Sequence, residues 1–228
     1  MDRKLLSEIL KLTKNKEILI IKELEEYFLK ERIENFLSYL KTEGIVLQPT
    51  IDGNYSITRE QRAQIAIIGA VNGLDFIEII DGLSWQEFEI LTTKVGDEFG
   101  YQAKKGLVFS DSERKYQIDV ILSKMPYVLV VDCKHYGGTG KKAVLKTAAE
   151  EQKIRARAFA DRFTELQEQI GLQKQLNMKI IPLVITWLDE SLFFHEKVPI
   201  VPFGRLRGFF RNFYLYIEDI EKIKINSH

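Results

Sequence analysis

Two opposite charges lie at the carboxyl end of the apolar run from Val128 to Val131. Such a continuous run is typical of a strand that is buried on both faces. Asp132 and Lys134 follow it, and because side chains alternate along a strand, these two point to the same face. A carboxylate can bind a metal cation, while a neighbouring ammonium can hold a water molecule or a phosphate oxygen. The spacing therefore predicts a site for metal-assisted chemistry.

The preceding strand adds a second carboxylate to this face. A two- or four-residue hairpin loop centred on residues 124–125 places Asp119 opposite Val130. Val130 shares its face with Asp132, so we expect Asp119 to join the site, together with Gln117. An odd-length loop would break this register, because a one-residue slip moves every side chain to the other face.

Two neighbouring carboxylates repel each other, and burying either one alone is costly. A divalent cation between Asp119 and Asp132 removes both problems. Mg²⁺ favours one or two carboxylates, several waters and phosphate oxygens, and the backbone carbonyl of Cys133 offers a further oxygen ligand. Lys134 cannot bind the metal while protonated, but it can orient a water or stabilise phosphate charge. The alternative is a plain ion pair between Asp132 and Lys134, which rarely adds net stability in a core.

The elements around this strand pair predict an α/β domain with a mixed sheet flanked by helices. A helix at 83–100 begins at Ser84, with Glu87 as its capping-box partner. Further helices are expected at 141–170 and 205–213, with a helical turn at 218–224. The expected strands are 105–110, 115–123, 127–136, 178–188 and 197–203.

The N-terminal part has a different pattern, in which apolar residues recur at helical spacing. It predicts helices at 2–13, 17–29 and 31–43, two short strands within 45–58 around an Asp52-Gly53 turn, and a helix at 59–72. Three helices followed by a β-hairpin resemble a winged-helix module. We therefore expect a winged-helix-like module at 1–60, a helical connector at 61–82 and the α/β domain at 83–228.

The segments "IDV" (118–120) and "VVDCK" (130–134) resemble the core of the PD-(D/E)XK nuclease superfamily, which includes Mrr-like restriction enzymes and archaeal Holliday-junction resolvases. The family pattern has an Asp on one core strand and Asp/Glu-x-Lys on the next, which Asp119, Asp132 and Lys134 match. The segment "WQEFE" matches the Mrr-like form of the preceding helix, which gives Glu89 the role of a further acidic residue, with Glu87 as second choice.

The resemblance extends over about residues 83–215 through the order of the elements, and it implies a restriction-endonuclease-like mixed sheet. In some members a Gln of the following helix faces the site, a position that Gln152 matches. The resemblance implies a Mg²⁺- or Mn²⁺-dependent endonuclease for DNA, with Asp119, Asp132, Glu89 and the Cys133 carbonyl at the metal. Asp132 stands where the family more often has Glu.

Basic residues near the predicted site are the expected contacts to nucleic-acid phosphates. They lie on the helix at 141–170 and in a second cluster around 205: Lys141, Lys142, Lys146, Lys153, Arg155, Arg205 and Arg207. An ordinary solvated helix face explains the first group equally well.

The helix expected to read DNA in the N-terminal module is acidic. It carries three carboxylates against two basic side chains: Glu31, Glu34 and Glu43, with Arg32 and Lys41. A helix in the major groove should be basic. The pattern therefore favours a module that makes a homodimer or another protein contact, while DNA binding through its wing stays open.

Composition limits the compartment and leaves the partner open. Lys plus Arg and Asp plus Glu number 33 each, so net charge neither predicts nor excludes nucleic acid. One cysteine and the lack of a long apolar run indicate a cytoplasmic protein that does not span a membrane. Two alternatives stay open: a non-catalytic DNA-binding or regulatory protein on a degenerate nuclease fold, and a nuclease that acts on RNA. Repair, restriction and recombination roles are not separable.

Overall fold

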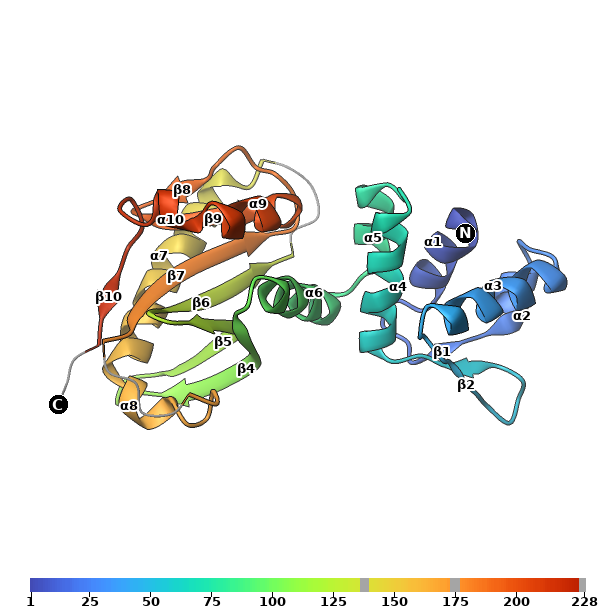
Figure 1. Cartoon of the computed structure of the whole chain (residues 1–228), viewed down its shortest axis with the longest axis horizontal. Coiled ribbons are helices and arrows are strands. Elements are labelled where there is room, and N and C mark those ends of the chain that lie inside the picture. Colours follow the sequence, from blue (N-terminus) through green and yellow to red (C-terminus); the bar gives the residue numbers. More distant parts are fainter. Residues whose placement is uncertain (136–139, 173–176, 226–228) are drawn as a thin grey trace. The chain divides into compact units, whose positions relative to one another are not determined.

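The structure is a computed structural model that describes residues 1–135, 140–172 and 177–225. The chain divides into two compact units, Met1–Ile90 and Leu91–His228 (Figure 1). The boundary falls within helix α6 (Trp85–Glu98). The predicted division at residues 60 and 83 stays a prediction.

The first unit consists of helices and a small antiparallel sheet with strand order β1-β3-β2. Its helices are α1 (Arg3–Leu12), α2 (Ile21–Glu25), α3 (Lys30–Thr42), α4 (Arg59–Val71) and α5 (Phe76–Gly82). Its strands are β1 (Ile18–Leu19), β2 (Gln48–Pro49) and β3 (Tyr55–Ser56). The predicted helix at 17–29 is wrong in its first part, because residues 18–19 pair with β3 as a strand.

A buried arginine connects the helices of the first unit. The Arg62 guanidinium, on α4, donates to Glu87 Oε1 at 2.8 Å, to the Leu10 carbonyl at 3.0 Å and to the Gly82 carbonyl at 2.5 Å. Glu87 Oε2 in turn accepts from the Ser84 backbone N–H at 2.6 Å, the contact predicted for the start of α6. Burial opposes ionisation of Glu87, but Ser84 and Arg62 outweigh it and hold its pKa below the ordinary value.

The second unit is built on a mixed sheet with the order β4-β5-β6-β7-β9-β8, and β10 pairs with β7. Its long strands are β4 (Gln102–Ser110), β5 (Lys115–Lys124), β6 (Tyr127–Lys134), β7 (Lys179–Thr186) and β9 (Val198–Pro202). The first three pair antiparallel, whereas β6, β7 and β9 run parallel. The predicted mixed α/β sheet is confirmed.

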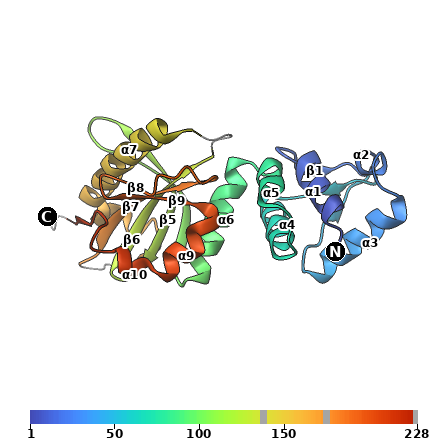
Figure 2. The ribbon, with the colours of Figure 1, turned by 90° about the horizontal axis from the view of Figure 1, so that it is seen from above.

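Helices cover both faces of this sheet (Figure 2). On one face, Ala156 and Phe159 of α7 (Lys142–Asp161) pack in a core cluster with Val130 of β6. On the other face, Gly96 of α6 lies so close to β5 that a Cβ there would be 2.6 Å from Leu122 Cδ2. The middle of the sheet is therefore packed on both faces, and Asp132 lies toward the carboxyl end of β6.

Short elements complete the second unit and correct several expectations. The predicted helix at 141–170 is divided into α7 and α8 (Phe163–Leu166), and the one at 205–213 into η1 (Phe203–Arg205), α9 (Leu206–Arg211) and α10 (Phe213–Tyr216). Within the predicted helical turn at 218–224, residues 223–224 form β10 (Ile223–Lys224), which pairs with β7. The hairpin strand β8 (Phe194–His195) was not predicted.

Candidate active site

The hairpin of β5 and β6 brings the predicted carboxylates together, in a register that differs from the expected one. Val120 pairs with Val131 and Lys124 with Tyr127, so the loop is centred on residues 125–126. Asp119 therefore lies level with Asp132, and the expected pairing with Val130 is wrong by two residues. A shift of two preserves the face, because the side-chain period of a strand is two.

Asp119 lies next to the backbone of β6. Its Oδ2 accepts a hydrogen bond from the Cys133 backbone N–H at 2.8 Å. Burial raises the pKa of Asp119 above its ordinary value, and the negative charge of Asp132 raises it further, whereas the Cys133 hydrogen bond, Arg155 and Lys134 lower it. The site thus holds a carboxylate that ionises reluctantly unless more positive charge arrives.

Asp132 is 4% exposed and has a cation at each carboxylate oxygen. Its Oδ1 accepts from Arg155 Nη1 at 3.1 Å, and its Oδ2 lies 2.9 Å from Lys134 Nζ. The second approach lacks the geometry of a hydrogen bond, so among the described residues the buried Oδ2 accepts none. The ion pair of Asp132 with Lys134 is therefore present, and it leaves one oxygen with unused acceptor capacity.

Helix α7 supplies two of the groups that hold this arrangement. Gln152 is fully buried, and its Nε2 donates to the Val130 carbonyl at 2.6 Å. Arg155 donates to Gln152 Oε1 as well as to Asp132. Residues three apart lie on the same face of a helix. That spacing from Gln152 is the signal by which Arg155, expected only as a phosphate contact, could have been placed at the carboxylates.

The donor set fits a divalent cation. Asp119 and Asp132 bring two carboxylates to the carboxyl end of β6, where two basic side chains already neutralise the negative charge. The Asp132 Oδ2 atom has a lone pair without a hydrogen bond, and hard oxygen donors are what Mg²⁺ and Mn²⁺ take. The side chain of Cys133 is not a ligand candidate here, since its Sγ lies on the opposite face, 3.8 Å from Thr92 Oγ1.

The burial of two other predicted site residues, Glu89 and Gln117, differs. Glu89 is buried, with 5% of its surface exposed, in the part of α6 that belongs to the first unit. Gln117 is exposed and lies between Tyr116 and Ile118, which both pack in the core beside α7. The part of both residues in the site stays a prediction.

Four of the predicted phosphate contacts are held by acidic side chains. The pairs are Lys153 with Glu221 at 3.6 Å, Arg155 with Asp132 at 3.1 Å, Arg205 with Asp189 at 2.7 Å, and Arg207 with Glu98 at 2.8 Å. In contrast, Lys142 and Lys146 are exposed on the first turns of α7, and the described residues include no ion-pair partner for them. The backbone N–H of Lys141 donates to Glu190 Oε2 at 3.0 Å.

A second polar cluster lies on the hairpin of β8 and β9. His195 Nε2 is 2.8 Å from Glu150 Oε1, and ligand atoms of Glu150, His195 and Glu196 all lie within 4.8 Å of one another. His195 and Glu150 are 45 residues apart in the chain, so local sequence patterns do not predict this contact. Lys153 Nζ is 3.9 Å from Glu196 Oε2, so a cation already lies beside this cluster.

The second unit is thus a mixed α/β domain with a carboxylate–lysine site at the carboxyl end of β6, where Asp119 from the middle of β5 joins it. No known protein-family model matches the chain. An uncharacterized protein from Archaeoglobus fulgidus is 30% identical over 138 residues, which are 60% of this chain and 97% of that protein. The chain belongs to the same family as this archaeal protein.

Two solved structures are similar at low TM-scores. Protein VC1899 from Vibrio cholerae matches with a TM-score of 0.41 and 10% identity, over 95% of this chain and 51% of that one. AF1548, a protein of unknown function, matches with a TM-score of 0.30 and 15% identity, over 52% and 57%. The chain spans about half the length of these solved proteins. Among the described residues, no helix is both long and apolar enough to cross a bilayer.

Proposed function

We propose that the protein is a divalent-metal-dependent endonuclease that hydrolyses phosphodiester bonds of DNA. The observation that carries the proposal is the convergence of Asp119, Asp132 and Lys134 at the carboxyl end of β6. There the Asp132 carboxylate contacts two basic side chains, Lys134 and Arg155. We further propose that the sheet is restriction-endonuclease-like and that the first unit is winged-helix-like. The order of the elements supports both.

Asp119, Asp132 and the Cys133 carbonyl would hold Mg²⁺ or Mn²⁺, with Glu89 contributing directly or through a water. When bound, the cation would polarise the scissile phosphate and make an adjacent water more acidic. Its positive charge would also favour the ionised form of Asp119, whose pKa is raised in the metal-free protein.

The side chains of the chain orient the reactants. Lys134, with 23% of its side chain exposed, can turn its ammonium from Asp132 toward an incoming water or phosphate oxygen. Arg155 can likewise donate to a phosphate oxygen once a metal takes its place at Asp132. In the hydrolysis the water oxygen forms a bond to phosphorus, the bond to the 3′-oxygen breaks, and a proton passes from the water through solvent to the leaving oxygen. Gln152 holds α7 against β6 through its hydrogen bond to the Val130 carbonyl, and so keeps Arg155 beside Asp132.

We assign the phosphate contacts outside the reacting centre to Lys141, Lys142 and Lys146. These residues lie at the start of α7, the helix that follows β6 in the chain. We also propose a homodimer, because a pair of such sites can cut both strands of a duplex. The acidic helix α3 supports a protein contact rather than a DNA contact for the first unit.

The test is cleavage of end-labelled nucleic acids with Mg²⁺ or Mn²⁺, by wild type beside Asp132→Ala and Lys134→Ala. The substrates are a linear duplex, a four-way junction, a flap, a single strand and an RNA. His195→Ala, in the second cluster, is the matched control. We expect metal-dependent cutting that Asp132→Ala abolishes, that Lys134→Ala reduces by about 10²- to 10⁴-fold, and that His195→Ala preserves.

Two results would replace the proposal. Cutting of the RNA alone would make the protein a ribonuclease. DNA binding without any cutting, unchanged in Asp132→Ala, would indicate a regulatory protein in which Asp132 and Lys134 form only an ion pair.

A further inference from the structure

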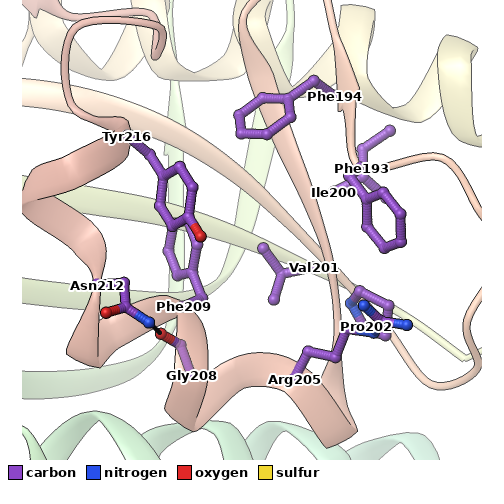
Figure 3. A pocket seen from close by; sticks show the side chains of 10 residues that line it. All are labelled: Phe193, Phe194, Ile200, Val201, Pro202, Arg205, Gly208, Phe209, Asn212 and Tyr216. Carbon is purple, nitrogen blue, oxygen red and sulfur yellow. Dashed lines mark hydrogen bonds between the residues drawn. The ribbon is translucent and has the colours of Figure 1, made fainter.

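An aromatic cavity lies beside β9, outside the set of residues assigned to hydrolysis (Figure 3). It has a volume of about 440 Å³, within the range of pockets that hold small molecules or single aromatic groups. Two pairs of rings form its walls. Phe209 and Tyr216, from α9 and α10, lie on one side, and Phe193 and Phe194, from the hairpin at β8, lie on the other.

Three of these four rings expose more surface than core residues do, whereas Phe209 is buried. Phe193 is 41% exposed, Phe194 40% and Tyr216 38%. Phe209 and Tyr216 are parallel, with ring centroids 6.2 Å apart and an interplanar angle of 6°. Flat apolar surface on both walls of an open cavity suits a flat, aromatic occupant, because stacking buries both of its faces.

The polar groups of the cavity suit an occupant with a hydrogen-bonding edge and a negatively charged backbone. The Arg205 guanidinium lies over the Phe193 ring at 5.0 Å from its centroid. Its ion pair with Asp189 is exposed and exchangeable, because exposed pairs contribute little free energy. Asn212 lines the opposite wall, where its Nδ2 donates to the Gly208 carbonyl at 3.0 Å and its amide oxygen is the group left to meet a base edge.

The strand register relates this cavity to the carboxylates. Within the parallel strands, Asp132 is level with Val184 of β7, which is level with Ile200 of β9. Ile200 and Pro202 both line the cavity. The cavity therefore begins two strands from Asp132 at the same level of the sheet, roughly 10 Å away within the sheet at the usual strand spacing. Its helices α9 and α10 cover the face opposite to α7 (Figure 2), so a nucleic-acid strand would reach both places around the carboxyl ends of the strands.

We propose that this cavity binds one unpaired base of the nucleic-acid substrate, stacked between the two ring walls. The inference rests on the proposed function and deepens it: the preferred substrate has an unpaired nucleotide near the scissile bond. A base in a duplex cannot enter, because both of its faces are already stacked and its edge is paired. Stacking on aromatic side chains is largely independent of sequence, so the cavity selects nucleic-acid structure and not base order.

The experiment measures binding separately from cleavage. The full chain carrying Asp132→Ala is titrated, without divalent metal, into a fluorescently labelled 12-nucleotide single strand and into the same strand fully paired. Phe194→Leu and Tyr216→Leu, one from each wall, are added to this background. Phe194→Trp keeps an aromatic ring, and Tyr27→Leu removes a ring that is 63% exposed elsewhere.

We expect Phe194→Leu and Tyr216→Leu each to weaken single-strand binding by at least about fivefold. The duplex affinity of every variant should stay within twofold of that of the background protein. The single-strand affinity of Phe194→Trp and of Tyr27→Leu should stay within the same range. Unchanged single-strand affinity in both Leu variants would overturn the proposal, as would equal losses for single strand and duplex. A change in oligomeric state on sedimentation, with affinity unchanged, would also overturn it and would assign the cavity to a second copy of the chain.

Failure of the two proposals is distinguishable. Ring-dependent binding of single strands in a protein that cuts no substrate would support the base site and reject the nuclease. Metal-dependent cutting that is indifferent to Phe194 and Tyr216 would reject the base site alone.

Discussion

Arg155 holds one carboxylate oxygen of Asp132 and places a positive charge beside the proposed metal site, so its removal should strengthen metal binding. In the metal-free protein, Nη1 of Arg155 donates to Asp132 Oδ1 at 3.1 Å. A metal cation at Asp132 Oδ2 would be repelled by this guanidinium across the same carboxylate, and a cation that used both oxygens of Asp132 would have to displace the contact. We therefore predict that Arg155→Met, which removes this positive charge, binds Mn²⁺ more tightly than wild type, although it also removes a proposed phosphate contact.

The magnitude follows from the contact. A hydrogen bond to a charged group contributes about 1.5–3 kcal/mol when buried, and an exposed ion pair about 0–1 kcal/mol. The Arg155 side chain is 19% exposed and that of Asp132 6%, so we expect about 1–2 kcal/mol. Because 1.4 kcal/mol corresponds to a factor of ten, the Mn²⁺ dissociation constant should fall about 5- to 30-fold. The metal-free variant should be less stable by a similar free energy.

Isothermal titration calorimetry with Mn²⁺ measures the affinity, and urea unfolding without metal measures the stability. Arg157→Met is the matched control, because Arg157 lies on the same helix, pairs with Glu221 and has a side chain that is 57% exposed. It should leave Mn²⁺ affinity unchanged. An Arg155→Met protein that binds Mn²⁺ as wild type does, or more weakly, would refute the competition between Arg155 and the metal.

Three further predictions concern charge and packing. Because the pKa of Asp119 is raised, the folded protein binds more protons than the unfolded chain in the window between about pH 4 and the folded pKa, and its stability falls as pH rises through that window. Metal-free Asp119→Asn should therefore melt at a higher temperature than wild type at pH 7, with the difference disappearing below about pH 4 in a thermal melt series. Arg62→Ala leaves the buried Glu87 carboxylate without its ion-pair partner and should lower the free energy of unfolding in urea by about 3–5 kcal/mol. Arg59→Ala, at an exposed position of the same helix, should change it by under about 0.5 kcal/mol. Equal effects of the two substitutions would show that the buried network is not stabilising. Gly96→Ala forces α6 away from β5 and should lower the free energy of unfolding by about 1–3 kcal/mol. Gly208→Ala, with open space around its Cβ position, should leave that free energy unchanged or raise it by about 0.4–1 kcal/mol.

The site was predictable from sequence to the extent that local periodicity determines it. Alternation along β6 predicted that Asp132 and Lys134 share one face, and in the structure Lys134 Nζ lies 2.9 Å from Asp132 Oδ2. The hairpin loop was placed one residue too early, which shifted the pairing by two. The carboxylates still converge, because an even shift preserves the face. The capping contact of Ser84 with Glu87 was likewise a local pattern, and it is confirmed.

Contacts between residues distant in sequence were not predictable. Residues 18–19 follow a helical pattern, yet they form a strand because β3, nearly forty residues later, supplies its backbone partner. Arg155 was one of several basic residues on α7, and only the folded sheet shows that its guanidinium meets Asp132. The same holds for His195, whose partner Glu150 lies on α7.

The central claim is that Asp119 and Asp132 hold the divalent ion on which hydrolysis depends. The most direct measurement is Mn²⁺ binding followed by electron paramagnetic resonance, with wild type, Asp132→Ala and His195→Ala compared at one protein concentration. The account predicts that Asp132→Ala loses the bound Mn²⁺ and that His195→Ala keeps it. Loss of Mn²⁺ in His195→Ala with full binding in Asp132→Ala would contradict the account and place the metal at the cluster of Glu150, His195 and Glu196.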